Sequence, residues 1–168
     1  MDLKTVQRPL KQQYRDEPSA ARITLKAKGN TEDSPIACSV DIGRAVYAAQ
    51  AHSGVGGAGT AACSGDLLLG ALAACAQVTC QMVATAMDLA VNGISVEVEG
   101  DLDLRGTLGV SRDVPVGFEE IRLKFVVDAP ELDDGQMATL IDKSERYCVV
   151  MQTLSNPGRL DTGWARPA

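Results

Sequence analysis

The chain has 168 residues, of which 45% are hydrophobic and only 4% aromatic. This length is that of one domain, whose core must be packed mainly from aliphatic side chains. The formal net charge of -6 at pH 7 argues against a nucleic-acid partner, since phosphate backbones are bound by clustered Lys and Arg. The start lacks a secretory signal pattern, and five cysteines without tight spacing are typical of a reducing compartment. We therefore expect a cytoplasmic protein.

The first residues predict a helical arm. Apolar side chains recur there at helical spacing and end before Pro18: they are Leu3, Val6, Leu10 and Tyr14. We therefore divide the chain into an N-terminal arm, residues 1–19, and a single α+β domain, residues 20–168.

Alternation of apolar and polar residues predicts antiparallel strands after the arm. Two strands are expected over 23–28 and 38–42, separated by the turn residues of 29–35, and 44–49 is a candidate for a third. Residues 52–64 are rich in Gly, Ala, Ser and Thr and are expected to form a loop.

A long uncharged segment follows, from Leu67 to Met87. It is long enough to raise the question of a membrane span, but its Gln, Thr and many Ala residues make it only weakly apolar, and no basic residues flank it. A helix buried inside a soluble protein is the better interpretation, so no membrane partner is expected. Asn92-Gly93 is expected to end this helical region.

The second half alternates between strand and helix patterns. Strands are predicted over 94–104 and 121–127, as a hairpin across the loop 105–117, and a helix over 135–155, with a short strand possible in the tail. This order indicates an α+β fold in which helices cover one face of antiparallel sheet. The long uncharged helix needs cover on nearly every side, which predicts a dimer that wraps it.

Three other chemistries are poorly supported. Gly54-Val55-Gly56-Gly57-Ala58-Gly59 fits G-x-G-x-x-G, but it does not open directly into a helix and no second βα unit follows, which disfavours a dinucleotide. A zinc site needs about four ligands with short spacing, and the chain has a single histidine, His52. A Cys-His hydrolase would lack an evident residue to orient that histidine.

Cysteine chemistry is the remaining candidate. A buried cysteine most often packs as a small hydrophobic residue, and we assign this role to Cys38, Cys63 and Cys80. An acidic residue followed by Leu-Leu-Leu-x-Ala-Leu-Ala-x-Cys spans Asp66 to Cys75. A Gly-rich stretch precedes it, Gly-Phe-Glu-Glu-Ile occupies 117–121, and Cys148 precedes Thr-Leu at 153–154. Over about residues 22–154, this combination resembles the OsmC/Ohr family of osmotically inducible and organic hydroperoxide resistance proteins.

The resemblance implies a fold, an activity and partners. The implied fold has antiparallel sheets wrapped around a long central buried helix in an intertwined homodimer. The implied activity is thiol-dependent reduction of organic hydroperoxides in oxidative stress defence, without cofactor or metal. Cys75 attacks the peroxide and becomes a sulfenic acid, Cys148 condenses with it to a disulfide, and an external dithiol restores both.

Some roles and departures from the family pattern remain open. The family's thiolate-pairing Arg is Arg22 or Arg44, held by Asp66, although Asp66 can equally be a helix cap. Typical members have Pro where this chain has Val149, and often Glu at the acidic position. The role of His52 is open. Apolar walls are expected to favour organic peroxides: Leu68, Leu72, Val78 and Met151. The rival interpretation is a non-catalytic dimeric ligand-binding or redox-sensing protein.

Overall fold

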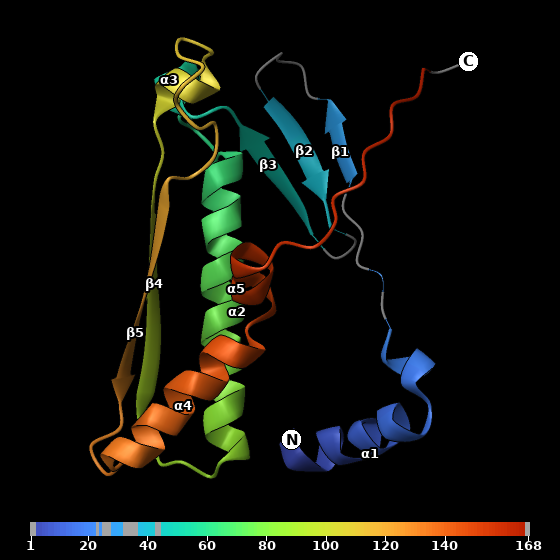
Figure 1. The fold of residues 1–168 in the computed structure, drawn as a ribbon, viewed down its shortest axis with the longest axis vertical. Helices are drawn as coiled ribbons and strands as arrows, with labels where there is room; N and C mark the ends of the chain where they lie inside the picture. The colour runs from blue at the N-terminus through green and yellow to red at the C-terminus, as the bar shows by residue number, and fades with distance from the viewer. Residues whose placement is uncertain (1–2, 23, 25–27, 32–36, 43–44, 167–168) are drawn as a thin grey trace.

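A computed structural model describes residues 3–22, 24, 28–31, 37–42 and 45–166. Helix α1 (Leu3–Asp16) and a 3-10 turn (Pro18–Ala21) precede a three-stranded antiparallel sheet, which contains β1 (Lys28–Thr31), β2 (Ala37–Asp41) and β3 (Val46–Gln50) in that order. The long helix α2 (Ser64–Ala86) follows a second 3-10 turn, Ser53–Val55. The rest is a hairpin of β4 (Gly93–Asp101) and β5 (Glu120–Asp128) with a short helix α3 (Leu104–Thr107) in its loop, then α4 (Asp134–Tyr147) and α5 (Val149–Ser155). Figure 1 shows α2 running alongside the hairpin, with α4 and α5 packed across it.

The β4–β5 hairpin has one apolar and one charged face because its residues alternate at period two. Val96 lies opposite Phe125 in the register, and Val98 lies opposite Leu123, all partly buried against α2. On the outer face Arg122 forms ion pairs with carboxylates of both strands. The sheet is therefore solvated on one side and supports α2 with the other.

Helix α2 begins with a capping box: the Cys63 sulfur accepts from the Asp66 N–H, and the Asp66 carboxylate accepts from the Cys63 N–H at 2.8 Å. One side of the helix then builds two core clusters, in which its buried residues recur every three or four positions: Leu72, Ala76, Cys80, Val83 and Ala84. By length and composition α2 could span a bilayer, but this side packs on β4, α4 and α5.

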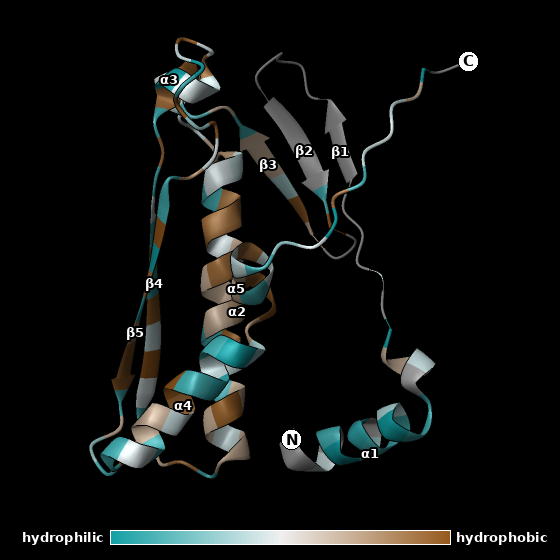
Figure 2. Ribbon diagram, in the orientation of Figure 1, coloured by the Kyte–Doolittle hydropathy of each residue, from teal (hydrophilic) through white to brown (hydrophobic). Residues whose placement is uncertain are grey.

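The opposite side of α2 remains open to solvent in the single chain. Leu68, Val78 and Met82 are 38%, 52% and 39% exposed, and Figure 2 shows the apolar character of the helix along its length. This exposed apolar side is the surface that the expected dimer would have to cover.

In the N-terminal half the predicted elements are mostly present. The first helix ends at Asp16, before Pro18, and the second and third strands lie close to their expected positions. The first strand was expected over 23–28, of which 23 and 25–27 lie outside the described residues. The turn was placed too early, because Gly29 and Asn30 pair with β2 as part of β1. Helix α2 begins three residues earlier than expected, at its capping box.

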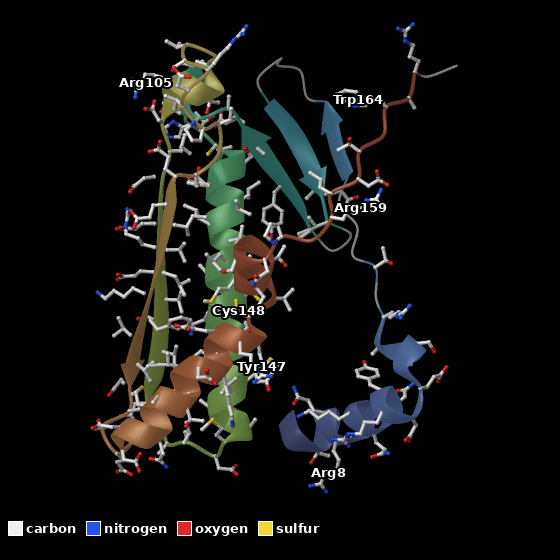
Figure 3. All side chains as sticks on the ribbon, viewed as in Figure 1. Arg8, Arg105, Tyr147, Cys148, Arg159 and Trp164 are labelled. Atoms are coloured by element: carbon white, nitrogen blue, oxygen red, sulfur yellow. The ribbon has the colours of Figure 1, made fainter. Side chains whose placement is uncertain are left out.

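In the C-terminal half four expectations were wrong. Helix α2 ends at Ala86, not at Asn92, and Asp88 adopts a left-handed conformation, φ 54°. The strand from 94 ends at Asp101, since Asp103 caps α3. The helix expected over 135–155 is divided at Cys148. Residues 156–166 form no strand, and Trp164 on this extended tail is 99% exposed (Figure 3).

Candidate active site

The structure brings Cys75 and Cys148 together. Cys75 lies near the middle of α2, partly buried, and packs against a cluster formed by Leu72, Ala76 and Cys148. Cys148 is fully buried, with 0% of its surface exposed. Two cysteines 73 positions apart in the sequence are thus in contact beneath the junction of the last two helices.

The break between α4 and α5 sets the position of Cys148. Its φ of -73° and ψ of 104° are extended, so it ends α4 and begins α5, and Figure 3 shows it at that junction. Its N–H still donates to the Ser144 carbonyl, and its own carbonyl accepts from Gln152 N–H at 2.9 Å. The break directs the first amides of α5 toward Cys75.

The surroundings of Cys75 favour its thiolate. Burial, the largest single influence, raises the pKa of Cys75, but hydrogen bonds from Val150 N–H, the Cys148 thiol, the Thr79 hydroxyl and Val149 N–H together outweigh it and leave the pKa below its usual value. A hydrogen-bond donor lowers the pKa of a thiol because it stabilises the negatively charged thiolate. Because the thiolate is the nucleophile, Cys75 is the better nucleophile of the two.

The pKa of Cys148 is shifted in the opposite direction, above its usual value. Burial is the largest influence and raises its pKa. The Met151 amide opposes this, but the nearby Cys75 sulfur, which accepts the Cys148 S–H, raises the pKa further, and the Val150 amide lowers it least. Cys148 is therefore harder to ionise than Cys75. This asymmetry in the pair matches the expected roles of attacking and resolving cysteine, which remain predictions.

Asp66 lies at the other end of the same helix segment. Nine residues separate it from Cys75, about 13 Å along the axis at 1.5 Å per residue. Its carboxylate caps α2, and the N–H of Cys63 is the main cause of its lowered pKa. The capping role of Asp66 is thus present, whereas the structure does not bring it beside Cys75 within one chain.

Of the two candidate arginines, only Arg22 lies among the described residues. Arg22 is exposed after the first 3-10 turn, where its N–H donates to the Ser19 carbonyl at 3.1 Å. Arg44 lies outside the described residues. Among the described residues, the donors that lower the pKa of Cys75 are amides, a hydroxyl and a thiol.

The remaining cysteines lie elsewhere. Cys80 is 2% exposed and lies in the core cluster that contains Leu140, not in the cluster that contains Cys148. Cys63 caps α2. The side chain of Cys38, in β2, is outside what the structure describes. His52 accepts from Gly54 N–H at 3.0 Å through Nδ1 and caps the turn at Ser53–Val55.

The Gly-rich stretch is explained by chain packing in that turn. A Cβ on Gly57 would lie 1.6 Å from the Ala51 carbonyl oxygen, and Gly56 has φ 94°. The turn is separated from the start of α2 by several residues. Glycines are therefore needed here for a close backbone approach.

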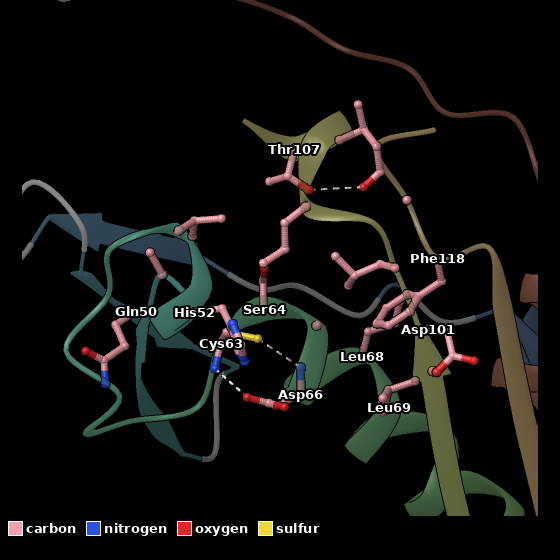
Figure 4. A pocket seen from close by; sticks show the side chains of 18 residues that line it. Gln50, His52, Cys63, Ser64, Asp66, Leu68, Leu69, Asp101, Thr107 and Phe118 are labelled. Atoms are coloured by element: carbon pink, nitrogen blue, oxygen red, sulfur yellow. Dashed lines mark hydrogen bonds between the residues drawn. The ribbon is translucent and has the colours of Figure 1, made fainter. Parts of the chain in front are cut away.

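An open cavity of about 1000 Å³ lies at the N-terminal end of α2, away from the cysteine pair (Figure 4). His52, Cys63 and Asp66 line it together with mainly apolar side chains, including Leu68 and Phe118. Of the four predicted apolar walls, Leu72 and Met151 lie in the cluster around the cysteine pair, Leu68 lines this cavity instead, and Val78 is exposed.

A family model described as OsmC-like protein matches residues 57–162, more than half of the chain. The chain belongs to the OsmC-like family. The match includes both cysteines of the pair and most of the residues that line the cavity. None of the curated proteins matches this chain.

Solved structures of OsmC-like proteins share the α+β fold. An OsmC-like protein from Mycoplasma pneumoniae is 19% identical, with 80% of this chain and 89% of that one covered and a TM-score of 0.65. An organic hydroperoxide resistance protein from Elizabethkingia anophelis is 18% identical, with 81% and 91% covered and a TM-score of 0.62. An OsmC-like protein of unknown function from Vibrio cholerae is 10% identical, with 79% and 94% covered and a TM-score of 0.60.

Sequence reasoning missed three members of the OsmC-like site. Thr79 follows Cys75 by one helical turn, a spacing that places both on one face, and this signal was available. The amides of Val149 and Val150 could not be anticipated, because the sequence predicted a continuous helix through Cys148. In a continuous helix those amides would be bonded to carbonyls four residues earlier.

Proposed function

We propose that this OsmC-like protein reduces organic hydroperoxides through the thiol of Cys75. The observation that supports this most is the opposite displacement of two adjacent thiol pKa values, lowered at Cys75 and raised at Cys148. A pair poised in this way suits one attacking and one resolving sulfur. Relatives named as organic hydroperoxide resistance proteins share the fold.

In the first step the Cys75 thiolate attacks one peroxide oxygen. An S–O bond forms, the O–O bond breaks, and the departing alkoxide takes a proton to leave as an alcohol, so Cys75 is oxidised to a sulfenic acid. The apolar surroundings from Leu72 and Met151 favour the organic part of an alkyl hydroperoxide over hydrogen peroxide.

In the second step Cys148 attacks the sulfenic sulfur. The S–S bond forms, the S–O bond breaks, and the Cys148 proton leaves with the hydroxide as water. Oxidation of Cys75 has already removed the negative charge that raised the pKa of Cys148, so the resolving thiol becomes easier to ionise when it is needed. A dithiol from a reducing cytoplasm then exchanges with the disulfide and regenerates both cysteines.

Peroxide consumption with cumene hydroperoxide and a small dithiol tests this proposal. Cys75→Ser should abolish turnover, whereas Cys148→Ser should permit one rapid oxidation and then stall or over-oxidise. After mild oxidation, peptide mapping should find a Cys75–Cys148 link within one chain. Full turnover by Cys75→Ser, or a link through Cys63 or Cys80, would contradict the assignment.

We further propose that the protein works as a homodimer that covers the open side of α2. The exposed Leu68, Val78 and Met82 form an apolar stripe of the kind that marks an interface. Sedimentation should give a dimer, and dilution should lower its melting temperature. A stable monomer at micromolar concentration would contradict this arrangement.

A second candidate function is supported by the separate cavity. A non-catalytic ligand-binding or redox-sensing protein would use its about 1000 Å³ of mainly apolar space without turning over peroxide. A fluorescent apolar probe should then bind equally to the wild type and to Cys75→Ser. Slow, non-stoichiometric oxidation of Cys75 by alkyl hydroperoxide would favour this alternative.

A further inference from the structure

Thr79 stands one helical turn after Cys75 on α2. Its Oγ1 lies 4.0 Å from the Cys75 sulfur, in a partly buried position. Large, polarisable sulfur makes long hydrogen bonds, so this distance is compatible with a contact that tightens when the sulfur carries charge.

The contact of this hydroxyl differs from the contacts of three other threonines in helices of this chain. Thr85, Thr139 and Thr153 each donate to the carbonyl oxygen four residues earlier at 2.8 Å, the usual outcome for threonine inside a helix. For Thr79 the residue four positions earlier is Cys75, and the recorded contact of the hydroxyl is with its sulfur. Threonine divides between two side-chain rotamers in helices, and here the hydroxyl faces the sulfur.

We propose that Thr79 is a positioning residue whose hydroxyl donates to the Cys75 thiolate and holds the sulfur in its reactive orientation. The relevance to peroxide turnover rests on the proposed function, but the effect on the thiol itself does not. Thr79 contributes a neutral donor beside the amides of Val149 and Val150. The lowered pKa of Cys75, which burial alone would raise, is consistent with this contact.

Three variants distinguish the effect of the Thr79 hydroxyl on Cys75 from the effect of side-chain packing. Thr79→Val keeps the branched shape and removes the donor, Thr79→Ser keeps the donor, and Thr85→Val removes a hydroxyl bonded to backbone in the same helix. The readout is the pH dependence of Cys75 alkylation by iodoacetamide, followed by mass spectrometry of the Cys75 peptide. Circular dichroism monitors folding, and Thr79→Ala replaces the valine variant if that variant does not fold.

We expect Thr79→Val to raise the pKa of Cys75 by about one unit, so that alkylation below the pKa slows about tenfold. Thr79→Ser and Thr85→Val should stay close to the wild type. An unchanged pKa in Thr79→Val, an equal shift in Thr79→Ser, or an equal shift in Thr85→Val would each overturn the proposal. If the expected shifts occur but the wild type consumes no peroxide, the proposed function fails and the role of Thr79 stands.

Discussion

Replacing Cys148 with alanine removes the thiol that donates to the Cys75 sulfur. We expect the pKa of Cys75 to rise, because burial, its largest influence, raises it and one opposing hydrogen bond is lost. A hydrogen bond to a charged group contributes about 1.5–3 kcal/mol, and a thiol is a weak donor. The lower end of that range corresponds to about one pH unit, since each unit is about 1.36 kcal/mol.

Cys80→Ala is the matched control for Cys148→Ala. Both cysteines are buried, at 2% and 0% exposure, so both variants lose one sulfur from the core and about 1 kcal/mol of unfolding free energy. Cys80 belongs to the other core cluster, with Leu140, and not to the cluster that includes Cys75. Only Cys148→Ala should shift the pKa of Cys75.

Stopped-flow measurement of the first oxidation of Cys75 across pH gives the decisive comparison. At a pH below the pKa of Cys75, the Cys148→Ala rate should fall about tenfold with the thiolate fraction, and it should recover toward the wild-type rate as the pH rises through the pKa of the variant. A pKa of Cys75 that is unchanged or lower in Cys148→Ala would refute the reasoning. So would an equal shift in Cys80→Ala, since the cause would then be a looser core.

Three further predictions concern stability, measured by urea unfolding. Leu140→Ala should lower the free energy of unfolding by about 2–5 kcal/mol, because Leu140 is fully buried. Ile141→Ala, at a neighbouring site that is 45% exposed, should lower it far less. Equal losses in the two variants would contradict the assigned core. Asp133→Ala should cost about 1 kcal/mol through loss of the α4 capping box, and no loss would show that the cap is dispensable. The pKa of Asp66 is lowered, mainly by Cys63 N–H, so its stabilisation is present above about pH 4 and is lost as pH falls through the folded-state pKa; Asp66→Asn should flatten that acid dependence.

Most of the secondary structure could be predicted because it follows from local periodicity. The β4–β5 hairpin alternates without interruption, and the uncharged helix was anticipated to within about three residues at its start. The errors lie where a single residue changes the chain direction. Asp88 ends the α2 region through a left-handed conformation, and Asp103 begins α3 where alternation suggested more strand.

The site was predictable only in part. The motif from Asp66 to Cys75 and the position of Cys148 indicated a cysteine pair, and the structure places those two residues in contact. A capping role for Asp66 was one of two alternatives that the sequence left open, and the structure places Asp66 at the third position of a capping box. The N-cap itself could not be anticipated, because it is a cysteine, Cys63, which is not among the usual capping residues. It also could not show the break at Cys148, which exposes the amides of α5 to the Cys75 sulfur.

Val149 gives the last test, because this chain has valine where typical family members have proline. Val149 is the first residue of α5, where proline is well tolerated, and Cys148 before it is already extended, as a residue before proline should be. Val149→Pro should therefore fold with little loss of stability while it removes one N–H that donates to the Cys75 sulfur. We expect the pKa of Cys75 to rise, and alkylation at pH 6.5 to slow accordingly. Val149→Ala, which keeps the N–H, is the control, and an unchanged pKa in Val149→Pro would show that this amide does not stabilise the thiolate.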